Sequence, residues 1–205
     1  MFILSVLKDT VRIVPSDFSI PKYEALEDEI NKKYSNKVLQ GVGLCICLYD
    51  ILEASEGFIF HSDGSSHVKV RFRMLVFRPH IGEVLTGKVK SCTSSGVRVT
   101  MDFFDDILIP PHYLPTPSEF DMEEQAWQWS FDGNPMWIDV GSNIRFRIED
   151  ETFTDTTPPP ANRQKTTVAE QEAMNSTKVP PYSLTATIAD EGLGDPEWWK
   201  GEEPV

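Results

Sequence analysis

The residue types in this chain that could carry out chemistry are its cysteines, its histidines and one acidic run that contains two phenylalanines. Cys45 and Cys47 alternate along an apolar run, and a period of two places both thiols on one strand face rather than around a tetrahedral metal ion. The histidines, which share no ligand spacing, are His61, His67, His80 and His112. We therefore expect buried packing for the cysteines, and neither a metal site nor a cofactor.

The acidic run is Asp102–Asp106, with Phe103 and Phe104 inside it. Asp105 and Asp106 should project to opposite sides of a strand, where they do not readily share an ion, so we interpret the run as a solvated turn. The sequence shows no glycine-rich phosphate loop, nucleophile elbow or paired general acid and base. The chain is therefore predicted not to be an enzyme.

Charge is distributed unevenly along the 205 residues, whose formal net charge is -13 at pH 7. This balance argues against a general nucleic-acid coat, because affinity for phosphate comes mainly from lysine and arginine. The stretch Lys69–Arg98 nevertheless holds seven lysines and arginines against one acid, Glu83. One basic face and several acidic faces are expected.

Two features of the sequence, its apolar start and its cysteines, indicate the cellular compartment of the protein. The apolar start Met1–Leu7 is followed at once by Lys8 and Asp9, which leaves it too short for a signal peptide or a membrane helix. An odd number of cysteines in apolar runs is unlike a disulfide framework and indicates a reducing compartment. We expect a soluble intracellular protein with no membrane partner.

The first half of the chain, residues 1–80, is predicted to be an α+β domain with an antiparallel sheet and one helix. The helix is expected at Pro21–Tyr34, where apolar residues recur at helical spacing. The predicted strands are Phe2–Val14, Val42–Leu52, Gly57–Phe60 and the run from His67. Because Val42–Leu52 is apolar on both faces, it should be a central strand.

The run from His67 alternates cleanly. Its predicted core face is Val68, Val70, Phe72, Met74 and Val76, and its outward face is His67, Lys69, Arg71 and Arg73. A basic stripe of this kind could bind RNA or dock an acidic partner. We favour docking of a protein partner. We expect the turn at Asp63 and Gly64, which precedes the strand, to take part in the same contact.

The second half, residues 81–205, is predicted to be an all-β OB-fold barrel with an inserted hairpin. Its expected strands are Glu83–Cys92, Val97–Met101, Phe103–Ile109, a run through Ile144–Glu149, and Tyr182–Ala189. The hairpin is predicted because Trp127, Trp129 and Phe131 alternate before an Asp132-Gly133 turn, which the apolar run Met136–Ile138 follows. The segment of about residues 154–181 has too few large apolar residues to order itself, so a disordered loop is expected. The short connection after Pro79 should keep the two domains close together.

Several motifs resemble a known family. Gly82–Val89, Gly96-Val97, Ile107–Pro110 with Leu114, and Gly141–Ile144 resemble an RNA-binding repeat first described in a ribosomal protein. Met1-Phe2, Asp63-Gly64-Ser65 and Val76–Pro79 leading into Gly82-Glu83-Val84 resemble the larger stalk subunit of archaeal and eukaryotic RNA polymerases. Val42–Leu48, Phe103–Pro111, Gly192-Leu193-Gly194 and Trp198-Trp199 are similar to the polymerase III version.

The resemblance implies a nuclear, non-catalytic subunit of DNA-directed RNA polymerase III. It would form a heterodimer with the smaller stalk subunit and dock on polymerase core subunits through its N-terminal domain. It would support transcription initiation on genes for transfer RNA and other small RNAs, contact initiation factors, and bind nascent single-stranded RNA through the OB domain. The insertion Pro115–Asp139 and the loop 154–181 depart from the simple repeat and could cover one edge of its usual surface.

For RNA contact an OB fold offers aromatic rings that stack on bases and cations that follow phosphates. The candidates are Lys88, Lys90, Arg98, Phe103, Phe104, Arg145 and Arg147. Since Phe103 and Phe104 are neighbours on an expected strand, only one can be a stacking surface. The alternatives are that both rings belong to the core and that the cations lie on ordinary solvated strand faces.

Two other functions remain possible from the residues. The OB domain alone would suit a free-standing single-stranded RNA-binding adaptor in translation or RNA decay. Such a protein would be stable without a partner and would bind RNA tightly with a steep salt dependence. A hydrolase would need nucleotide turnover that depends on Asp105 or Asp106.

Overall fold

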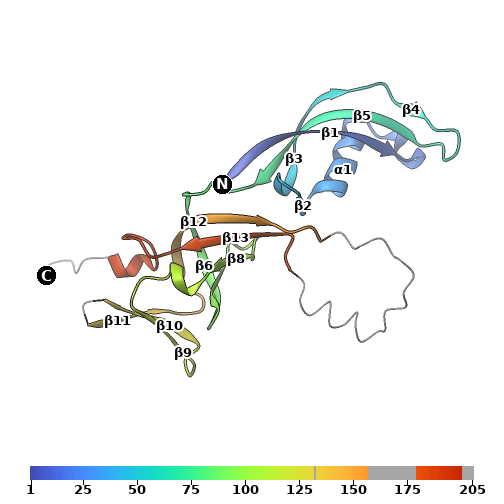
Figure 1. The fold of residues 1–205 in the computed structure, drawn as a ribbon. Helices are drawn as coiled ribbons and strands as arrows, with labels where there is room; N and C mark the ends of the chain where they lie inside the picture. Colours follow the sequence, from blue (N-terminus) through green and yellow to red (C-terminus); the bar gives the residue numbers. More distant parts are fainter. Residues whose placement is uncertain (132, 157–178, 200–205) are drawn as a thin grey trace, which may run out of the picture. The chain divides into compact units, whose positions relative to one another are not determined.

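The computed structural model describes residues 1–131, 133–156 and 179–199 (Figure 1). The chain divides into two compact units, Met1–Pro79 and His80–Val205. Each unit buries a set of large apolar side chains of its own. No helix in these described ranges is long and apolar enough to cross a membrane.

The first unit is an antiparallel sheet with one α-helix against one face, as the sequence predicts (Figure 1). Its elements are β1 (Phe2–Ile13), the 3-10 helix η1 (Pro15–Ser19), α1 (Lys22–Tyr34), β2 (Lys37–Leu39), β3 (Gly43–Ala54), β4 (Phe58–Ile59) and β5 (Ser66–Phe77). The strand order is β1-β5-β3-β2, and β4 pairs with the start of β5. Strand β5 therefore lies between β1 and β3 and joins the whole sheet.

The core of the first unit lies between α1 and β5. Leu26 and Ile30 of α1 are fully buried, and so are Phe72, Met74 and Val76 of β5. The alternation predicted for the run from His67 is therefore confirmed. An unbroken period of two is enough to bury one face of a strand when a helix covers that face.

Polar contacts fasten α1 to the sheet. The Asn31 side-chain oxygen accepts a hydrogen bond from the Leu48 amide at 2.8 Å, and the Tyr34 hydroxyl donates to Asp9 at 2.7 Å. Burial alone would raise the pKa of Asp9, but hydrogen bonds from Lys33 and Tyr34 outweigh it and hold that pKa below its ordinary value. The Asp9 carboxylate therefore stays ionised and ties the end of α1 to β1.

Strand β3 is irregular, with register shifts between Cys45 and Cys47, Leu48 and Asp50, and Ile51 and Glu53. Cys45 is fully buried whereas Cys47 is exposed, so the prediction that both thiols share one buried face is wrong. The reason is that an extra residue at a bulge reverses the alternation of side chains. As predicted, β3 is a central strand that lies between β5 and β2, but Tyr49 on its outward face is 60% exposed.

The second unit contains a closed five-stranded barrel in the order β12-β13-β8-β7-β6, consistent with the predicted OB fold. The strands are β6 (Val84–Thr93), β7 (Gly96–Thr100), β8 (Ile107–Ile109), β12 (Asn143–Phe153) and β13 (Tyr182–Thr187). All neighbours are antiparallel except β13 and β8. Their inward side chains fill the barrel; Val97, Val99, Ile107, Ile109, Phe146 and Tyr182 are buried.

The third barrel strand is shorter than the predicted Phe103–Ile109, because it begins only at Ile107. A turn comes first: Asp102 has a φ of 65°, and the Met101 amide donates to the carbonyl oxygen of Phe104 at 2.9 Å. A left-handed residue of this kind cannot continue an extended strand. The short 3-10 helix η2 (Pro111–Tyr113) follows β8.

The insertion is a three-stranded sheet in the order β11-β10-β9, rather than a hairpin alone. The predicted hairpin is present as β10 (Ala126–Phe131) and β11 (Asn134–Ile138), and β9 (Ser118–Asp121) adds a third strand. The Trp127 indole N–H donates to the Thr93 carbonyl oxygen at 3.0 Å, which ties this sheet to β6. Of the predicted loop 154–181, residues 157–178 lie outside the described residues.

Candidate RNA-contact and docking surfaces

The barrel gathers four of the predicted RNA-contact cations on its outer surface. Lys88 and Lys90 are exposed on β6, Arg98 is exposed on β7, and Arg145 is exposed on β12. Strand pairing sets Lys88 opposite Thr100 on one side and Asn143 on the other, so the three strands are direct neighbours here. We call Lys88, Lys90, Arg98 and Arg145 the barrel basic face.

An acidic residue lies within this face. Lys90 forms an ion pair with Asp105 at 2.7 Å, and Thr100 also donates to that carboxylate. The hydrogen bond from Lys90 holds the pKa of Asp105 below its ordinary value, so the carboxylate is ionised and neutralises the lysine. Lys88, Arg98 and Arg145 are therefore the cations of this face without such a partner among the described residues.

Asp105 and Asp106 were expected to project to opposite sides of a strand. Both instead line the same cavity, of about 210 Å³, together with Arg98. Burial raises the pKa of Asp106, while the positive charge of Arg98 acts in the opposite direction. No group of three histidines, cysteines or acids that could hold a metal ion occurs in the described part of the chain.

The two neighbouring phenylalanines have different environments. Phe103 is 44% exposed, whereas Phe104 is 6% exposed and its ring centroid lies 5.6 Å from that of Tyr182. The prediction that Phe104 contacts RNA is therefore wrong, because the turn after β7 directs this ring into the core. Phe103 is the ring that a base could reach.

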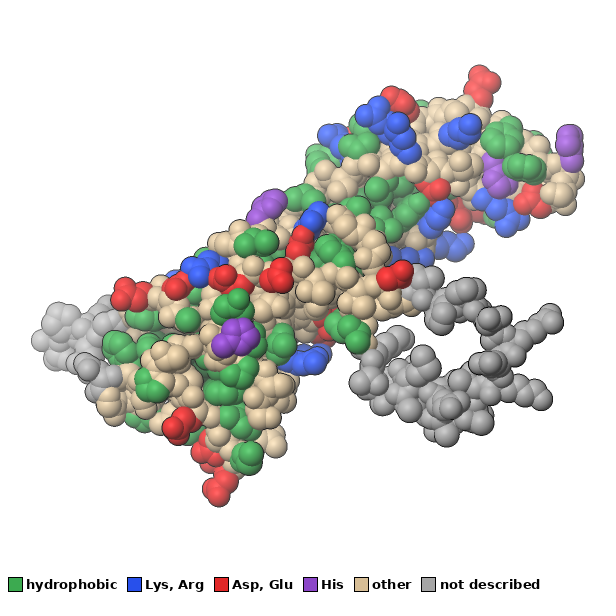
Figure 2. Space-filling model, in the orientation of Figure 1, with side chains coloured by type: hydrophobic (Ala, Val, Ile, Leu, Met, Phe, Trp, Pro, Cys, Tyr) green, Lys and Arg blue, Asp and Glu red, His purple; other side chains and the backbone are tan. Residues whose placement is uncertain are grey.

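Arg147 is the remaining predicted RNA contact, and it is already bound by acids. Its guanidinium donates to Glu149 at 2.7 Å and forms an ion pair with Asp190. The hydrogen bond that Arg147 donates to Glu149 raises the pKa of Arg147, so its charge is fixed but neutralised locally. Acidic and basic side chains are interspersed on the face of this unit seen in Figure 2.

The predicted basic stripe of the first unit is also interrupted by acids. Arg73 donates to Asp50 at 2.7 Å and lies over the Tyr49 ring, 5.2 Å from its centroid, and Arg71 donates to Glu53 at 3.2 Å. The strand register places each acid of β3 opposite its arginine of β5. Lys69 is exposed next to this paired region, so the surface is a mixed charged one rather than a purely basic one.

The same outward face is apolar toward the start of β1, a feature that the sequence reasoning missed. Phe2, Leu4 and Val6 are 45%, 43% and 49% exposed, and exposed Cys47 and Tyr49 lie on β3. We call these five residues the apolar sheet end. A possible signal was that β1 is apolar in both phases of its alternation, which is unusual for a strand with one solvated face.

At the other end of the sheet, Asp63 and Gly64 lie in the turn before β5. Asp63 pairs with Arg12 at 3.0 Å and accepts a hydrogen bond from the Ser65 amide at 3.0 Å, and Gly64 has a φ of 67°. The backbone hydrogen bond from Ser65 is the main reason that the pKa of Asp63 is lowered. These two residues therefore fix the shape of the turn.

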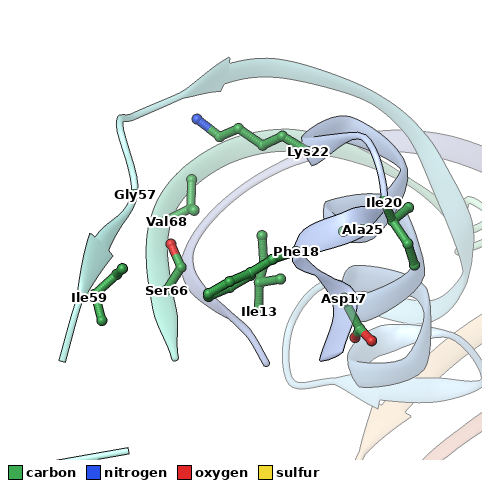
Figure 3. A pocket seen from close by; sticks show the side chains of 10 residues that line it. All are labelled: Ile13, Asp17, Phe18, Ile20, Lys22, Ala25, Gly57, Ile59, Ser66 and Val68. Atoms are coloured by element: carbon green, nitrogen blue, oxygen red, sulfur yellow. The ribbon is translucent and has the colours of Figure 1, made fainter. Parts of the chain in front are cut away.

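Beside this turn is a groove of about 320 Å³ between η1, α1 and β4. Figure 3 shows Ile59 on one side, Ile20 and Ala25 on the other, and Phe18 between them. Ile13 and Val68 complete the apolar lining, and Asp17, Lys22 and Ser66 add polar groups. We call it the tip groove; Phe18 and Ile59 are 48% and 60% exposed, so apolar surface is accessible there.

Comparison with known proteins shows which family the chain resembles. The model described as RNA polymerase III subunit Rpc25 matches residues 83–199, and the model described as the SHS2 domain found in the N terminus of Rpb7p/Rpc25p/MJ0397 matches residues 8–64. DNA-directed RNA polymerase III subunit rpc8 of Schizosaccharomyces pombe is 47% identical, over 98% of this chain and 100% of the relative.

Two further relatives agree. Subunit RPC8 of the same polymerase is 42% identical in Bos taurus, over 97% of this chain and 98% of the relative. It is 38% identical in Saccharomyces cerevisiae, over 98% of this chain and 100% of the relative. The resemblance seen in the sequence is therefore confirmed, and the chain belongs to the Rpc25 family of RNA polymerase III subunits.

Proposed function

We propose that this chain is the larger, non-catalytic stalk subunit of DNA-directed RNA polymerase III in the nucleus. It pairs with the smaller stalk subunit, docks on the polymerase core and contacts nascent RNA during initiation on transfer RNA and other small RNA genes. The observation that carries the proposal is the near full-length similarity to RPC8 proteins, joined to a first unit with exposed apolar surface and a barrel with exposed cations.

The first unit supplies surfaces that suit protein partners. The apolar sheet end and the tip groove offer apolar area that a partner can cover, which is what the centre of a protein interface requires. The charged region around Lys69, Arg71 and Arg73 offers both signs of charge for orienting a partner. Asp63 and Gly64 shape the turn at the end of the same unit.

Docking through the tip groove predicts that Ile59→Asp will lower recovery of polymerase subunits by at least about tenfold when the tagged chain is purified from nuclei. The reason is that a buried apolar anchor in a protein interface is typically worth about 2 kcal/mol or more. Mass spectrometry of the purified material measures the loss.

Met122→Asp is the matched control, because Met122 is 80% exposed in the turn after β9 and lies outside the groove. Equal recovery with both variants would show that the tip groove is not a docking site. Absence of polymerase subunits from the unchanged protein would remove the stalk proposal itself and favour a free-standing RNA-binding adaptor.

RNA contact through the barrel predicts two separate effects on binding to single-stranded RNA. Phe103→Ala should weaken binding by about 1–3 kcal/mol, which is the usual value of one stacked base. Lys88→Ala and Arg145→Ala should each reduce the salt dependence, since each removes about one phosphate contact. Fluorescence anisotropy at several salt concentrations measures both effects.

Lys32→Ala is the control, because Lys32 is a 77% exposed cation on α1 of the other unit. It changes net charge by the same amount without touching the barrel. If Lys32→Ala weakened binding as much as Lys88→Ala, the attraction would be a property of total charge rather than of the barrel basic face.

A further inference from the structure

Four aromatic rings meet between the inserted sheet and the last described helix, η3 (Pro196–Trp199). The Trp129 ring is central: its centroid lies 5.0 Å from Phe131, 5.4 Å from Trp198 and 6.4 Å from Trp199. The planes are inclined by 41–50°, so the rings form walls rather than a flat stack. The Trp199 indole N–H donates to the Leu193 carbonyl oxygen at 2.7 Å, which fixes that ring.

These walls enclose a small pocket, which we call the Trp pocket. Trp129, Phe131, Trp199, Leu193, Asp190 and Glu191 are among its lining residues, and its volume is about 90 Å³. Sites for whole small molecules are usually about 300–1,000 Å³, so this pocket suits the end of a single side chain. Phe131 and Trp199 are 49% and 39% exposed, which leaves the opening accessible from solvent.

The charges around the pocket determine whether it favours a positively or a negatively charged side chain. Arg147 binds both Glu149 and Asp190, so one guanidinium already faces two carboxylates. Glu191 lines the pocket beside Asp190 and has no ion pair within the described ranges, so three carboxylates and one guanidinium lie in or next to the lining. The surplus of negative charge opposes the phosphates of RNA and favours a cation.

We propose that the Trp pocket binds the arginine side chain of a basic segment in a protein partner. A guanidinium is planar, so it can stack on an indole face while its N–H groups reach the Glu191 carboxylate. The pairing of Arg147 with Asp190 shows that an acid of this lining accepts a guanidinium. None of the lining residues belongs to the barrel basic face or to the tip groove, and the proposal does not depend on the stalk assignment.

The test is a titration of the full isotope-labelled chain with a short Gly/Ser peptide that carries one central arginine, followed by the indole N–H signals in NMR. We expect saturable shifts of the Trp129 and Trp199 signals. Trp137 should not shift, because it pairs with Gln128 and so faces the opposite side of the inserted sheet from Trp129.

Variants locate the site. Trp199→Ala should weaken peptide binding about tenfold through loss of the cation–π contact. Glu191→Gln should weaken it about two- to fivefold, as expected for one exposed ion pair. Glu123→Gln is the matched control, since this acid lies in the exposed turn after β9, and it should change nothing. Unchanged melting temperatures exclude misfolding as the cause.

Several results would overturn the proposal. Equal binding of the same peptide with lysine in place of arginine would contradict recognition of a guanidinium. Stronger shifts with a proline-rich peptide or with an RNA oligonucleotide would assign the pocket to a different ligand. An absence of saturable shifts with the arginine peptide would mean that the rings serve only to pack η3 on the inserted sheet.

Discussion

Replacing Phe72 by alanine is expected to destabilise the first unit by about 3–5 kcal/mol, the usual range for removal of a fully buried phenylalanine. Phe72 is 0% exposed and lies on β5, which pairs with both β1 and β3. Its ring lies 5.7 Å from the Tyr34 ring at the end of α1. The cavity would therefore open where the helix and three strands meet.

Amide hydrogen exchange along β5 measures this change, because protection there reports the opening of the sheet. Phe58→Ala is the matched control in the same unit: Phe58 is 46% exposed, so little packing is lost. If Phe72→Ala left exchange along β5 as slow as Phe58→Ala does, the placement of the core between α1 and β5 would be wrong.

The sequence predicted the elements whose pattern is unbroken. The run from His67 alternates without interruption, so its buried face could be read directly. The same holds for the inward residues of β12, where Ile144, Phe146 and Ile148 are all fully buried. Tight turns between short strands then favoured a barrel, because few folds connect five short strands in this way.

Irregular backbone is what the sequence could not show. The bulges of β3 are not marked by any glycine or proline, and they place Cys47 and Tyr49 on the outward face. Because Phe103 and Phe104 are neighbours, the alternation of side chains predicted that one of the two rings points inward, but not which one. Only the turn at Asp102 decides that it is Phe104.

Contacts between residues far apart in the sequence could not be predicted either. Asp50 and Arg73 are 23 positions apart and meet only through the register of β3 against β5. From the sequence alone the outward residues of β5 form a basic stripe. The register shows that acids of β3 neutralise part of it. The tip groove likewise combines η1 with β4, and the Trp pocket combines β10 with η3, so neither has a local signature.

Gly96→Ala is expected to destabilise the barrel by about 2–6 kcal/mol, from two causes that act together. Gly96 has a φ of 134°, a conformation that costs a residue with a Cβ about 1–3 kcal/mol. The added Cβ would also lie 2.3 Å from the Ile109 carbonyl oxygen, and such overpacking typically costs about 1–3 kcal/mol. Backbone on β8 cannot give way without separating Val97 from Ile109 in the β7–β8 pair.

Gly141→Ala separates the two causes, because Gly141 has a φ of 95° but nothing within 4 Å of an added Cβ. It should therefore show the strain alone, about 1–3 kcal/mol. Urea unfolding followed by tryptophan fluorescence suits the comparison, since all five tryptophans belong to the second unit. Equal losses in the two variants would mean that β7 does not approach β8 this closely, and the closure of the barrel between these strands would have to be abandoned.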